Sequence, residues 1–559
     1  MPTLLHSRTA SVLLAAASIL AAACAADSSD PDGDGKNDVS DDVVAYPPEP
    51  GAIASPAYSI KAGTHQIFVQ HFGEESFARF AMGKPTTLAI RINEPVKQVR
   101  TVPESLAADA SFAGDTVLFE IREPRPIVLF INSQEKLFLF PDDDEAAPKL
   151  GAPDVVNVLD HGADKTGQLA TAPIQAAIDE AASLSGGGTV VFPPGLYTTG
   201  TLSLKSHVTL YLMAGARIKG SRIATNYPID PGRHERGSDT SITDADAKFA
   251  GEFMTFSRLL LIGEATDVHI AGHGTIDGDG AFVRQQLNAV PNLIRVRSSS
   301  NVTIRDVMLR DSAAWTLHLL DSDGVDITNV KILNDRNNLN TDGIDVDSSR
   351  NVNIERAFIY TKDDGVCLKG SNNSDLLADV ENVTVTNSIV SSVDAALKLG
   401  TESRSARFHN VMFENNDVFD SDRAMSVVVR DGARYSDVTY KQIRVSVGVR
   451  HLVEQVIGIR ANQATVLGTI ENLTFDTIDA PHFTAPASNW TWYAQYRPSK
   501  PQANDPNIPV FEGADASHAV TGLTFRNFTV RGERLVDPES AARLAGLQIG
   551  DFVTDVSWE

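Results

Sequence analysis

Short apolar runs, each preceded by an Asn, Asp or Gly, recur along most of the second half of the chain. Clear copies are Asn301–Ile304, Asn351–Ile354 and Asn382–Val385. A short strand that repeats at this period behind a turn residue predicts a solenoid of β coils, each with three strands, rather than a series of β-sandwiches. Alternate residues would face inward, so that Val, Ile and Leu side chains stack along the axis. The copies start at Asp267, Asn301, Gly324, Asn351, Asn382, Asn410 and Asp437, and more weakly at Asn472 and Gly522; from Asn301 to Asp437 the intervals are 23, 27, 31, 28 and 27 residues.

The residues before the repeats show a different pattern. Residues 47–147 contain short β runs separated by turn signals at regular spacing, which predicts a β-sandwich domain closed by a linker over Pro141–Pro148. The next residues predict a helix over Thr171–Leu184 and a strand over Thr189–Pro193. We therefore assign residues 155–559 to the solenoid domain with C-terminal loops. The β runs of the sandwich are His65–Gln70, Thr87–Ile92, Thr116–Ile121, Ile127–Ile131 and Leu137–Phe140.

The first residues of the chain have the pattern of an export signal. Arg8 precedes an apolar run over residues 12–23 that is too short to span a bilayer as a helix, so we predict a signal peptide over residues 1–24. Leu20–Cys24 resembles a bacterial lipobox, which would make Cys24 a lipid-modified first residue of an outer-membrane lipoprotein. The alternative is ordinary cleavage one or two residues later, which would give a secreted protein.

Composition and charge narrow the function classes. The 559 residues are 42% hydrophobic, enough for a large core, and carry a formal net charge of −24. No basic stripe could neutralise phosphates, which argues against nucleic acid as a partner. Residues 27–42 hold seven Asp and one Lys, and we predict that residues 25–46 form an acidic disordered tether rather than a calcium loop. Cys367 would be alone in the mature domain, so no internal disulfide is possible. We expect a monomer.

Two acidic clusters within the repeats carry the candidate chemistry. Asn340–Asp345 has the sequence NTDGID, and Asp363-Asp364 follows, with Asp363 21 positions after Asp342. Because stacked coils lie about 4.8 Å apart, this spacing predicts that the two loops sit side by side on one face. Carboxylates held together across a groove suggest hydrolysis of a glycosidic bond, in which one protonates the leaving oxygen and another activates water. The alternative role, capping of backbone amides in turns, is the one that we expect for Asp345 and Asp347.

The same residues carry a family resemblance. Asn340–Asp345, followed by Asp363-Asp364 before Cys367–Lys369, resembles the polygalacturonase family, glycoside hydrolase family 28. Gly272–Gly278 and Gly400–Glu402 are similar to segments upstream and downstream of that family's site, and the resemblance covers roughly residues 155–480. It implies a right-handed parallel β-helix and an inverting mechanism without metal or cofactor. It also implies roles for three residues, with Asp363 as general acid and Asp342 with Asp364 positioning and deprotonating the water.

Two elements of that family are missing from this chain. A Gly-His-Gly motif is replaced by Val393–Ala396, and an Arg-Ile-Lys that holds the substrate carboxylate is replaced by Met425–Asp431. A uronate substrate still needs positive charge in the site. We expect Arg430 to supply one cation and Lys369 or Lys398 another. The complete set of residues expected to bind substrate is Asn340, Lys369, Lys398, Glu402 and Arg430.

Because these two elements are missing, the sequence allows more than one sugar polymer as the substrate. The dextranase family, glycoside hydrolase family 49, is also similar to this chain, because it shares both Asp clusters, lacks the histidine motif and has a β-sandwich before its β-helix. That resemblance implies neutral α-glucans, whereas Lys369 and Gly400–Glu402 favour the pectin enzymes. We expect pectic galacturonan first and an α-glucan second. A β-helix pectate lyase would need calcium and an arginine base, and a non-catalytic adhesin or sugar-binding surface protein would not need Asp363.

Overall fold

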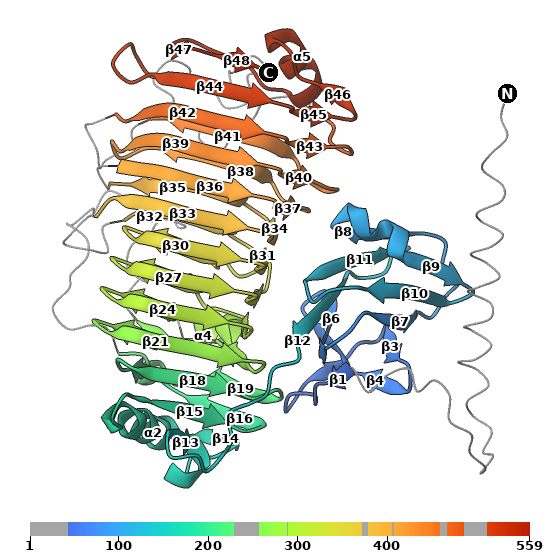
Figure 1. Ribbon diagram of the computed structural model, residues 1–559. Helices are drawn as coiled ribbons and strands as arrows, with labels where there is room; N and C mark the ends of the chain where they lie inside the picture. The colour runs from blue at the N-terminus through green and yellow to red at the C-terminus, as the bar shows by residue number, and fades with distance from the viewer. Residues whose placement is uncertain are drawn as a thin grey trace. The chain divides into compact units, whose positions relative to one another are not determined.

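In the computed structural model the described residues are 43–228, 257–287, 289–371, 378–404, 407–458, 467–485 and 511–559. The chain divides into two units, Met1–Ala146 and Ala147–Glu559 (Figure 1). The expected signal peptide, lipidated Cys24 and most of the acidic tether lie outside the described residues. Among the helices in the described ranges, none combines the length and apolar character needed to cross a bilayer.

The first unit is built from two sheets that share one apolar core. Its core includes Ile60 and Leu88 from one sheet and Phe80 and Leu129 from the other, as expected for a β-sandwich. The larger sheet has the order β2 (Ile53–Ala54), β5 (Val69–Phe72), β6 (Glu75–Met82), β12 (Leu137–Asp143), β11 (Ile127–Ile131) and β8 (Val99–Val102), with β1 (Val43–Ala45) also on β6. The smaller has the order β4 (His65–Ile67), β3 (Ser59–Ala62), β7 (Thr86–Arg91), β10 (Thr116–Ile121) and β9 (Ala110–Ala113), and η2 (Glu104–Asp109) is a short 3-10 helix.

The structure corrects both expected ends of this unit. Val43–Ala45, placed in the tether from the sequence, forms β1 and pairs with Phe80–Met82, because an apolar Val-Val-Ala segment can extend the sheet. Pro141 and Asp142, placed in the linker, continue β12 in parallel register with β6. Proline is tolerated here because β11 pairs only with Leu137–Leu139 and so leaves the other side of the strand open.

The second unit is a right-handed parallel β-helix whose coils contribute to three long parallel sheets, as predicted (Figure 1). The first sheet contains β13 (Val155–Asn157), β15 (Gly188–Phe192), β18 (Val208–Leu212), β21 (Thr266–Gly272), β24 (Ser300–Arg305), β27 (Asp323–Thr328), β30 (Arg350–Glu355), β33 (Val380–Thr386), β36 (Arg407–Glu414), β39 (Arg434–Lys441), β42 (Thr469–Asp476), β44 (Val520–Arg526), β47 (Val553–Thr554) and β48 (Ser557–Trp558).

The other two sheets complete each coil. The second sheet contains β14 (Thr166–Leu169), β16 (Gly195–Thr199), β19 (Ala216–Gly220), β22 (Thr275–Asp277), β25 (Met308–Arg310), β28 (Lys331–Leu333), β31 (Phe358–Thr361), β34 (Ile389–Ser392), β37 (Asp417–Val418), β40 (Arg444–Val445), β43 (Asp479–Ala480), β45 (Thr529–Val530) and β46 (Glu533–Arg534). The third contains β17 (Leu202–Leu204), β20 (Arg258–Gly263), β23 (Asn292–Arg297), β26 (Leu317–Leu320), β29 (Ile344–Asp347), β32 (Val366–Gly370), β35 (Ala395–Ser403), β38 (Arg423–Val429) and β41 (His451–Ile457).

Helices occupy the ends and one side of the β-helix. The predicted helix is α2 (Thr171–Ser183), which buries Ile174, Ala177, Ile178 and Ala181. Figure 1 shows α2 at one end of the stack of coils and α5 (Pro538–Ala545) at the other. The remaining helices are α4 (Gly280–Leu287), η3 (Val158–His161) and η4 (Ala224–Asn226). With the ends covered in this way, the exposed edge strands of the stack are protected.

The interior of the β-helix is a set of side-chain ladders that run along its axis. Every copy of the sequence repeat lies in the first sheet, and the second residue of each copy pairs with its counterpart, as in the run Val302, Val325, Val352 and Val383. The fourth residues of the copies form a second ladder, which is aromatic near the C-terminal end, with ring centroids separated by 4.8, 5.4, 5.6 and 4.4 Å along Phe413, Tyr440, Phe475, Phe525 and Trp558. These ladders confirm the coil period read from the sequence.

Left-handed turn residues explain the Asn, Asp or Gly at the start of each copy. Asn351, Asn382 and Asn410 have φ angles of 55°, 55° and 54°, a region that glycine and asparagine adopt more readily than other residues. Their amides also form a ladder between coils, in which Asn382 Nδ2 donates to Asn351 Oδ1 over 2.9 Å and Asn410 Nδ2 donates to Asn382 Oδ1 over 2.7 Å. The repeat is therefore set by backbone conformation as well as by the core.

The two contributions of Asn382 can be separated by substitution. Asn382→Ala loses the amide ladder. It also places at positive φ a residue that has a Cβ but no side-chain hydrogen bond, and this backbone conformation costs about 1–2 kcal/mol. Asn382→Gly loses the same ladder but keeps the conformation available. We expect the melting temperature in calorimetry to fall more for the Ala variant than for the Gly variant. Equal melting temperatures would show that backbone conformation does not select this residue.

Candidate active site

Loops between the second and third sheets carry the two acidic clusters. Asp342 lies between β28 and β29, and Asp363-Asp364 lies between β31 and β32, on the next coil. Pairing of Ile344 with Val366 places Asp364 at the position that corresponds to Asp342. The Gly343 amide donates to the Asp364 carbonyl over 2.8 Å. The loops therefore lie side by side, as the repeat spacing predicted.

A glycine follows each of these aspartates because the coils approach closely there. A Cβ on Gly343 would lie 2.4 Å from the carbonyl oxygen of Gly365, and a Cβ on Gly365 would lie 2.5 Å from that of Ala396. Both distances are far below van der Waals contact. The Asp-Gly pattern is thus required by the coil stacking that brings the carboxylates together.

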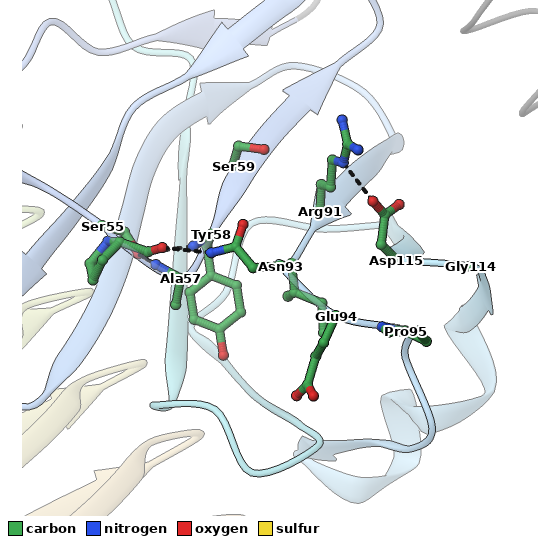
Figure 2. Close-up of a pocket in the computed structure, with 12 residues that line it drawn as sticks. Ser55, Ala57, Tyr58, Ser59, Arg91, Asn93, Glu94, Pro95, Gly114 and Asp115 are labelled. Atoms are coloured by element: carbon green, nitrogen blue, oxygen red, sulfur yellow. Dashed lines mark hydrogen bonds and ion pairs between the residues drawn. The ribbon is translucent and has the colours of Figure 1, made fainter.

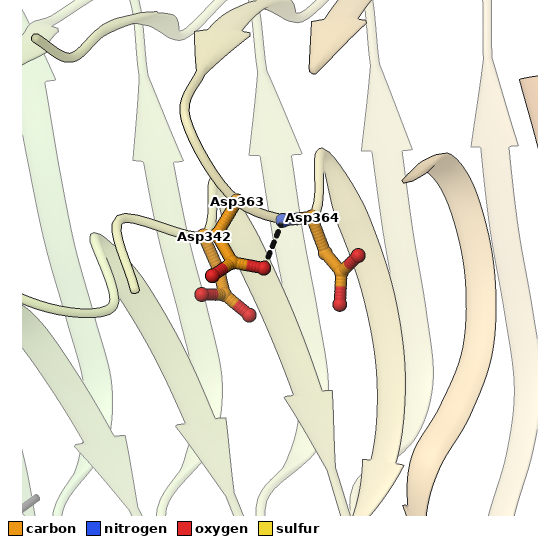
Figure 3. Close-up of side chains that lie close together, drawn as sticks. All are labelled: Asp342, Asp363 and Asp364. Carbon is orange, nitrogen blue, oxygen red and sulfur yellow. Dashed lines mark hydrogen bonds between the residues drawn. The ribbon is translucent and has the colours of Figure 1, made fainter. Parts of the chain in front are cut away.

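The three carboxylates form one compact group. One oxygen from each of Asp342, Asp363 and Asp364 lies within 4.8 Å of the others. Figure 3 shows the three side chains extending in the same general direction from the two loops. Asp342 and Asp364 are buried, whereas Asp363 is half-buried and its Oδ1 accepts a hydrogen bond from the Asp364 amide over 3.0 Å. The half-buried member is therefore the one most accessible to a substrate.

Two buried lysines offset part of this negative charge. Lys369 Nζ lies 2.7 Å from Asp342 Oδ2 and 3.0 Å from Asp345 Oδ1, and Lys398 Nζ lies 2.7 Å from Asp364 Oδ2. Burial disfavours a charge on Lys369, but the carboxylates beside it hold its pKa well above the ordinary value. These contacts tie both lysines to aspartates. Their predicted role as cations for substrate remains a prediction.

Burial and mutual repulsion favour protons on two of these carboxylates, Asp342 and Asp363. Burial raises the pKa of Asp342 well above its ordinary value, with the charges of Asp345, Asp363 and Asp364 adding to the effect and Lys369 opposing it. Burial also raises the pKa of Asp363, followed by the adjacent charge of Asp364. A raised pKa favours the protonated carboxyl, which is the form that a general acid requires.

Asp345 and Asp347 differ in role, although both were expected to cap turns. Asp347 does so, because its Oδ1 accepts the Ser371 amide over 2.8 Å and its Oδ2 lies 3.1 Å from His318 Nε2. The expectation for Asp345 is wrong. Its side chain points outward from β29 toward Lys369, and no backbone amide in the described ranges bonds to it.

The other residues expected to bind substrate lie at different distances from the carboxylates. Asn340 Oδ1 accepts a hydrogen bond from Arg284 Nη2 over 2.8 Å. Glu402 Oε2 lies 3.8 Å from Lys369 Nζ, which places it beside the group. Arg430 follows β38, two strands beyond β32 in the third sheet, or about 10 Å along the axis. The structure thus brings Asn340 and Glu402 toward the site and leaves Arg430 on a more distant coil.

Sequence reasoning missed two residues of the site. Trp315 lies beneath Lys369, whose ammonium is 3.9 Å from the centre of the indole ring. Trp315 occupies the position of Asp342 one coil earlier, because Leu317 pairs with Ile344, so the register could have indicated it. Arg284 lies on α4, a helix inserted between strands, and no repeat pattern marks it.

The row of positions that contains Asp342 and Asp364 continues with Ala395 and Arg423. Ala395 lies in the segment that replaces the family's histidine motif. The Arg423 guanidinium contacts Asp394, and its Nε lies 3.5 Å from Glu454 Oε2. Arg423 thus places a cation in the same row of positions as Asp342 and Asp364, and the carboxylates of Asp394 and Glu454 lie beside it.

A separate pocket of about 720 Å³ lies in the first unit and has no comparable chemistry (Figure 2). Two of its charged groups pair with each other, since Arg91 Nε lies 2.8 Å from Asp115 Oδ2, and Glu94 Oε1 accepts a hydrogen bond from Gln134 Nε2 over 2.8 Å. Asn93 Nδ2 donates to the Pro56 carbonyl over 2.9 Å. Geometry therefore favours the carboxylates of the β-helix, and not this pocket, as the active site.

The titration of Asp345 provides a test of the buried charges. Burial raises its pKa to about 7, against about 3.9 in an unfolded chain. The folded protein binds this proton more tightly, so the stabilisation is present below about pH 4 and is lost as the pH rises through about 7. Asp345→Asn cannot titrate. Its unfolding free energy, relative to wild type, should increase between pH 4 and pH 7 in denaturant titrations.

The exposed Asp326→Asn is the matched control and should follow wild type at each pH. A constant difference between Asp345→Asn and wild type across this range would contradict the raised pKa.

The part of the chain that holds this site is similar to known proteins. Residues 236–478, which include all three carboxylates, match the family model for glycosyl hydrolases family 28. A probable polygalacturonase from Vitis vinifera is 32% identical over 225 residues, which are 38% of this chain and 44% of that protein. An endo-polygalacturonase from Pectobacterium carotovorum subsp. carotovorum is 26% identical over 349 residues, or 57% of this chain and 80% of that protein.

The solved structure of Dex49A from Penicillium minioluteum superimposes with a TM-score of 0.58 at 11% identity, over 91% of this chain and 96% of that one, which supports the fold alone. The match spans less than half of the Vitis relative's length. The family match nevertheless covers the strands and loops that hold Asp342, Asp363 and Asp364. Residues 236–478 of this chain therefore resemble glycosyl hydrolases family 28, and the relatives described above are named polygalacturonases.

Proposed function

We propose that this protein hydrolyses α-glycosidic bonds in a pectic polysaccharide or its oligomers. The observation that carries the proposal is the group of three carboxylates on adjoining coils, with one oxygen of each within 4.8 Å of the others. Two members are held by lysines, and the third is half-buried. This is a division into fixed and accessible carboxylates, which acid/base hydrolysis requires.

Asp363 is the general acid in this proposal. Its raised pKa keeps a proton that can pass to the glycosidic oxygen as the bond from that oxygen to the anomeric carbon breaks. The leaving sugar then departs with a neutral hydroxyl group at the former glycosidic oxygen. Asp363 becomes a carboxylate, which the nearby lysines stabilise electrostatically.

Asp342 and Asp364 hold and deprotonate the attacking water. Each of these aspartates has a cation 2.7 Å away, Lys369 beside Asp342 and Lys398 beside Asp364, and Lys369 opposes the rise that burial causes in the pKa of Asp342. The water oxygen forms the new bond to the anomeric carbon, and its proton passes to a carboxylate. Protonated Asp342 or Asp364 and ionised Asp363 then exchange a proton through solvent to restore the starting state.

The pectic substrate is supported by the names of the relatives. The Vitis vinifera and Pectobacterium relatives are named polygalacturonases, and a Dickeya chrysanthemi protein that is 25% identical over 367 residues is named an exo-poly-alpha-D-galacturonosidase. An α-glucan substrate is favoured by the sequence resemblance to the dextranase family and by the missing Arg-Ile-Lys, whereas none of these relatives is named for it. Galacturonan is therefore the first substrate to test.

Asp363→Asn should remove the acid while keeping the shape of the site. We expect kcat on polygalacturonate to fall by about 10²–10⁴-fold, with KM changed little, because general acid catalysis contributes about that much. Reducing-sugar release from polygalacturonate, rhamnogalacturonan, dextran and pullulan, with and without calcium, measures it. Asp326→Asn, an exposed aspartate of the same domain, is the control and should retain wild-type kcat.

Three results of this assay would count against the proposal. The variant could retain the wild-type rate, which would exclude Asp363 as the acid. The wild-type protein could release no sugar from any polymer of the panel. It could instead generate an unsaturated product that absorbs ultraviolet light, which indicates a lyase.

We propose that hydrolysis inverts the anomeric carbon. Carboxyl separations of about 6.5–9.5 Å are usual for inverting enzymes and about 5 Å for retaining ones, so a group with one oxygen of each member within 4.8 Å of the others does not by itself favour inversion. Two carboxylates assigned to one water, rather than one carboxylate as nucleophile, support it. Proton NMR during the first turnovers should show the β-anomer as the initial product of an α-linked substrate. An initial α-anomer would establish retention.

We also propose that the protein is exported, either as a lipoprotein anchored through Cys24 or as a secreted enzyme. Arg8 and the apolar run before Cys24 support the proposal. A polymeric substrate outside the cell would require such export.

A further inference from the structure

The helix α4 brings a buried arginine to the same side of the β-helix as the carboxylates. It lies in the connection between β22 and β23, which joins the second sheet to the third. Asp342 and Asp363-Asp364 lie in the corresponding connections of later coils. Arg284 is the buried basic residue of this helix, with only 8% of its surface exposed.

The Arg284 guanidinium links α4 to two loops. Its Nη1 donates to the carbonyl oxygens of Ala313 and Leu339 over 2.9 and 2.7 Å, and its Nη2 donates to Asn340 Oδ1 over 2.8 Å. Ala313 belongs to the loop before β26, and Leu339 and Asn340 directly precede Thr341 and Asp342. One planar group with several donors thus fixes the segment that leads into Asp342.

Asn340 gives this contact its structural importance. Its φ angle is 56°, so the chain reverses at a left-handed residue two positions before Asp342. The Arg284 bond to its side chain holds that turn from one side. Thr341 Oγ1, which donates to the Asn338 carbonyl over 2.8 Å, holds it from the other. A small change at Asn340 would therefore displace the Asp342 carboxylate.

Arg284 also acts on the charge of the site. The three oxygens that accept its hydrogen bonds carry no formal charge. Burial lowers the pKa of Arg284, and the negative charge of Asp363 counteracts this effect, so the guanidinium and that carboxylate interact electrostatically. Asp342, Asp364, Lys369 and Lys398 are the other charged groups that face Asp363.

We propose that Arg284 is a positioning residue for hydrolysis, which orients the Leu339–Asp342 segment against α4 and places a positive charge beside Asp363. The inference rests on the proposed function for its kinetic consequences. It extends that function to a helix outside the acidic clusters. Arg284 acts through Asn340 and Asp363 and does not itself perform the chemistry.

Two substitutions separate the geometric role from the charge. Arg284→Lys keeps a cation but loses the planar fork, and Arg284→Gln loses both. We expect kcat to fall about tenfold or more in both variants with KM changed by less than about threefold, because a misplaced carboxylate slows the chemical step. In Arg284→Gln the loss of positive charge raises the pKa of Asp363. The alkaline limb of the pH profile should therefore move to higher pH, and in Arg284→Lys it should stay near that of wild type.

Arg350→Gln is the matched control, because Arg350 is a partly exposed arginine of the first sheet that pairs with Asp323 over 3.0 Å. It should leave kcat and the pH profile unchanged. Hydrogen–deuterium exchange provides a readout that does not depend on activity. The peptide that contains Leu339–Asp342 should exchange faster in Arg284→Gln than in wild type or Arg350→Gln.

The outcomes distinguish this inference from the proposed function. If wild type hydrolyses polygalacturonate and Asp363→Asn does not, but folded Arg284→Gln has wild-type kcat and an unshifted alkaline limb, the positioning role is overturned and the proposed function stands. If wild type cleaves no polymer, the proposed function fails, and hydrogen–deuterium exchange is then the measurement that tests the positioning role of Arg284. Unchanged exchange in Arg284→Gln would then overturn the inference, and faster exchange would support the positioning of this segment.

Discussion

Backbone hydrogen bonds between successive coils determine where every functional side chain of this protein lies. The Gly343 amide bonds to the Asp364 carbonyl over 2.8 Å, and the Ile344 amide bonds to the Gly365 carbonyl over 2.9 Å. A shift of one residue would turn Ile344 out of the core and Asp345 into it, so the core and the site enforce the same register. Residues 22 positions apart therefore become neighbours, and two short acidic motifs become a single group of carboxylates.

Stacking in register has an electrostatic consequence. It concentrates Asp342, Asp345 and Asp364 in a largely buried region, where removing one partner of a buried ion pair costs about 3–5 kcal/mol. Lys369 and Lys398 come from strands β32 and β35 of the same stack, and so the coil register supplies the compensating charges as well. The buried aspartates are fixed in this way, while half-buried Asp363 remains open to exchange protons with a substrate.

Sequence reasoning succeeded where a residue's role depends on the coil period. The left-handed turns at Asn351 and Asn382 and the valine ladder are local and repeat, so the strands of the first sheet and the proximity of Asp342 to Asp364 could be predicted. It failed where the role depends on which way a strand side chain points or on an inserted element. Asp345 was expected to cap a turn, but it faces Lys369 from β29. Arg284 lies on a helix that interrupts the repeat, and Val43–Ala45 joined a sheet across a compositional boundary.

The central claim is that a glycosidic bond is cleaved over Asp342, Asp363 and Asp364. The most direct test is a crystal structure of the Asp363→Asn protein with a galacturonate oligosaccharide bound. We predict that a glycosidic oxygen lies within about 3 Å of the substituted side chain, with Asp342 and Asp364 facing the anomeric carbon of the same bond. An oligosaccharide bound only elsewhere, such as in the pocket of the first unit, would contradict the claim.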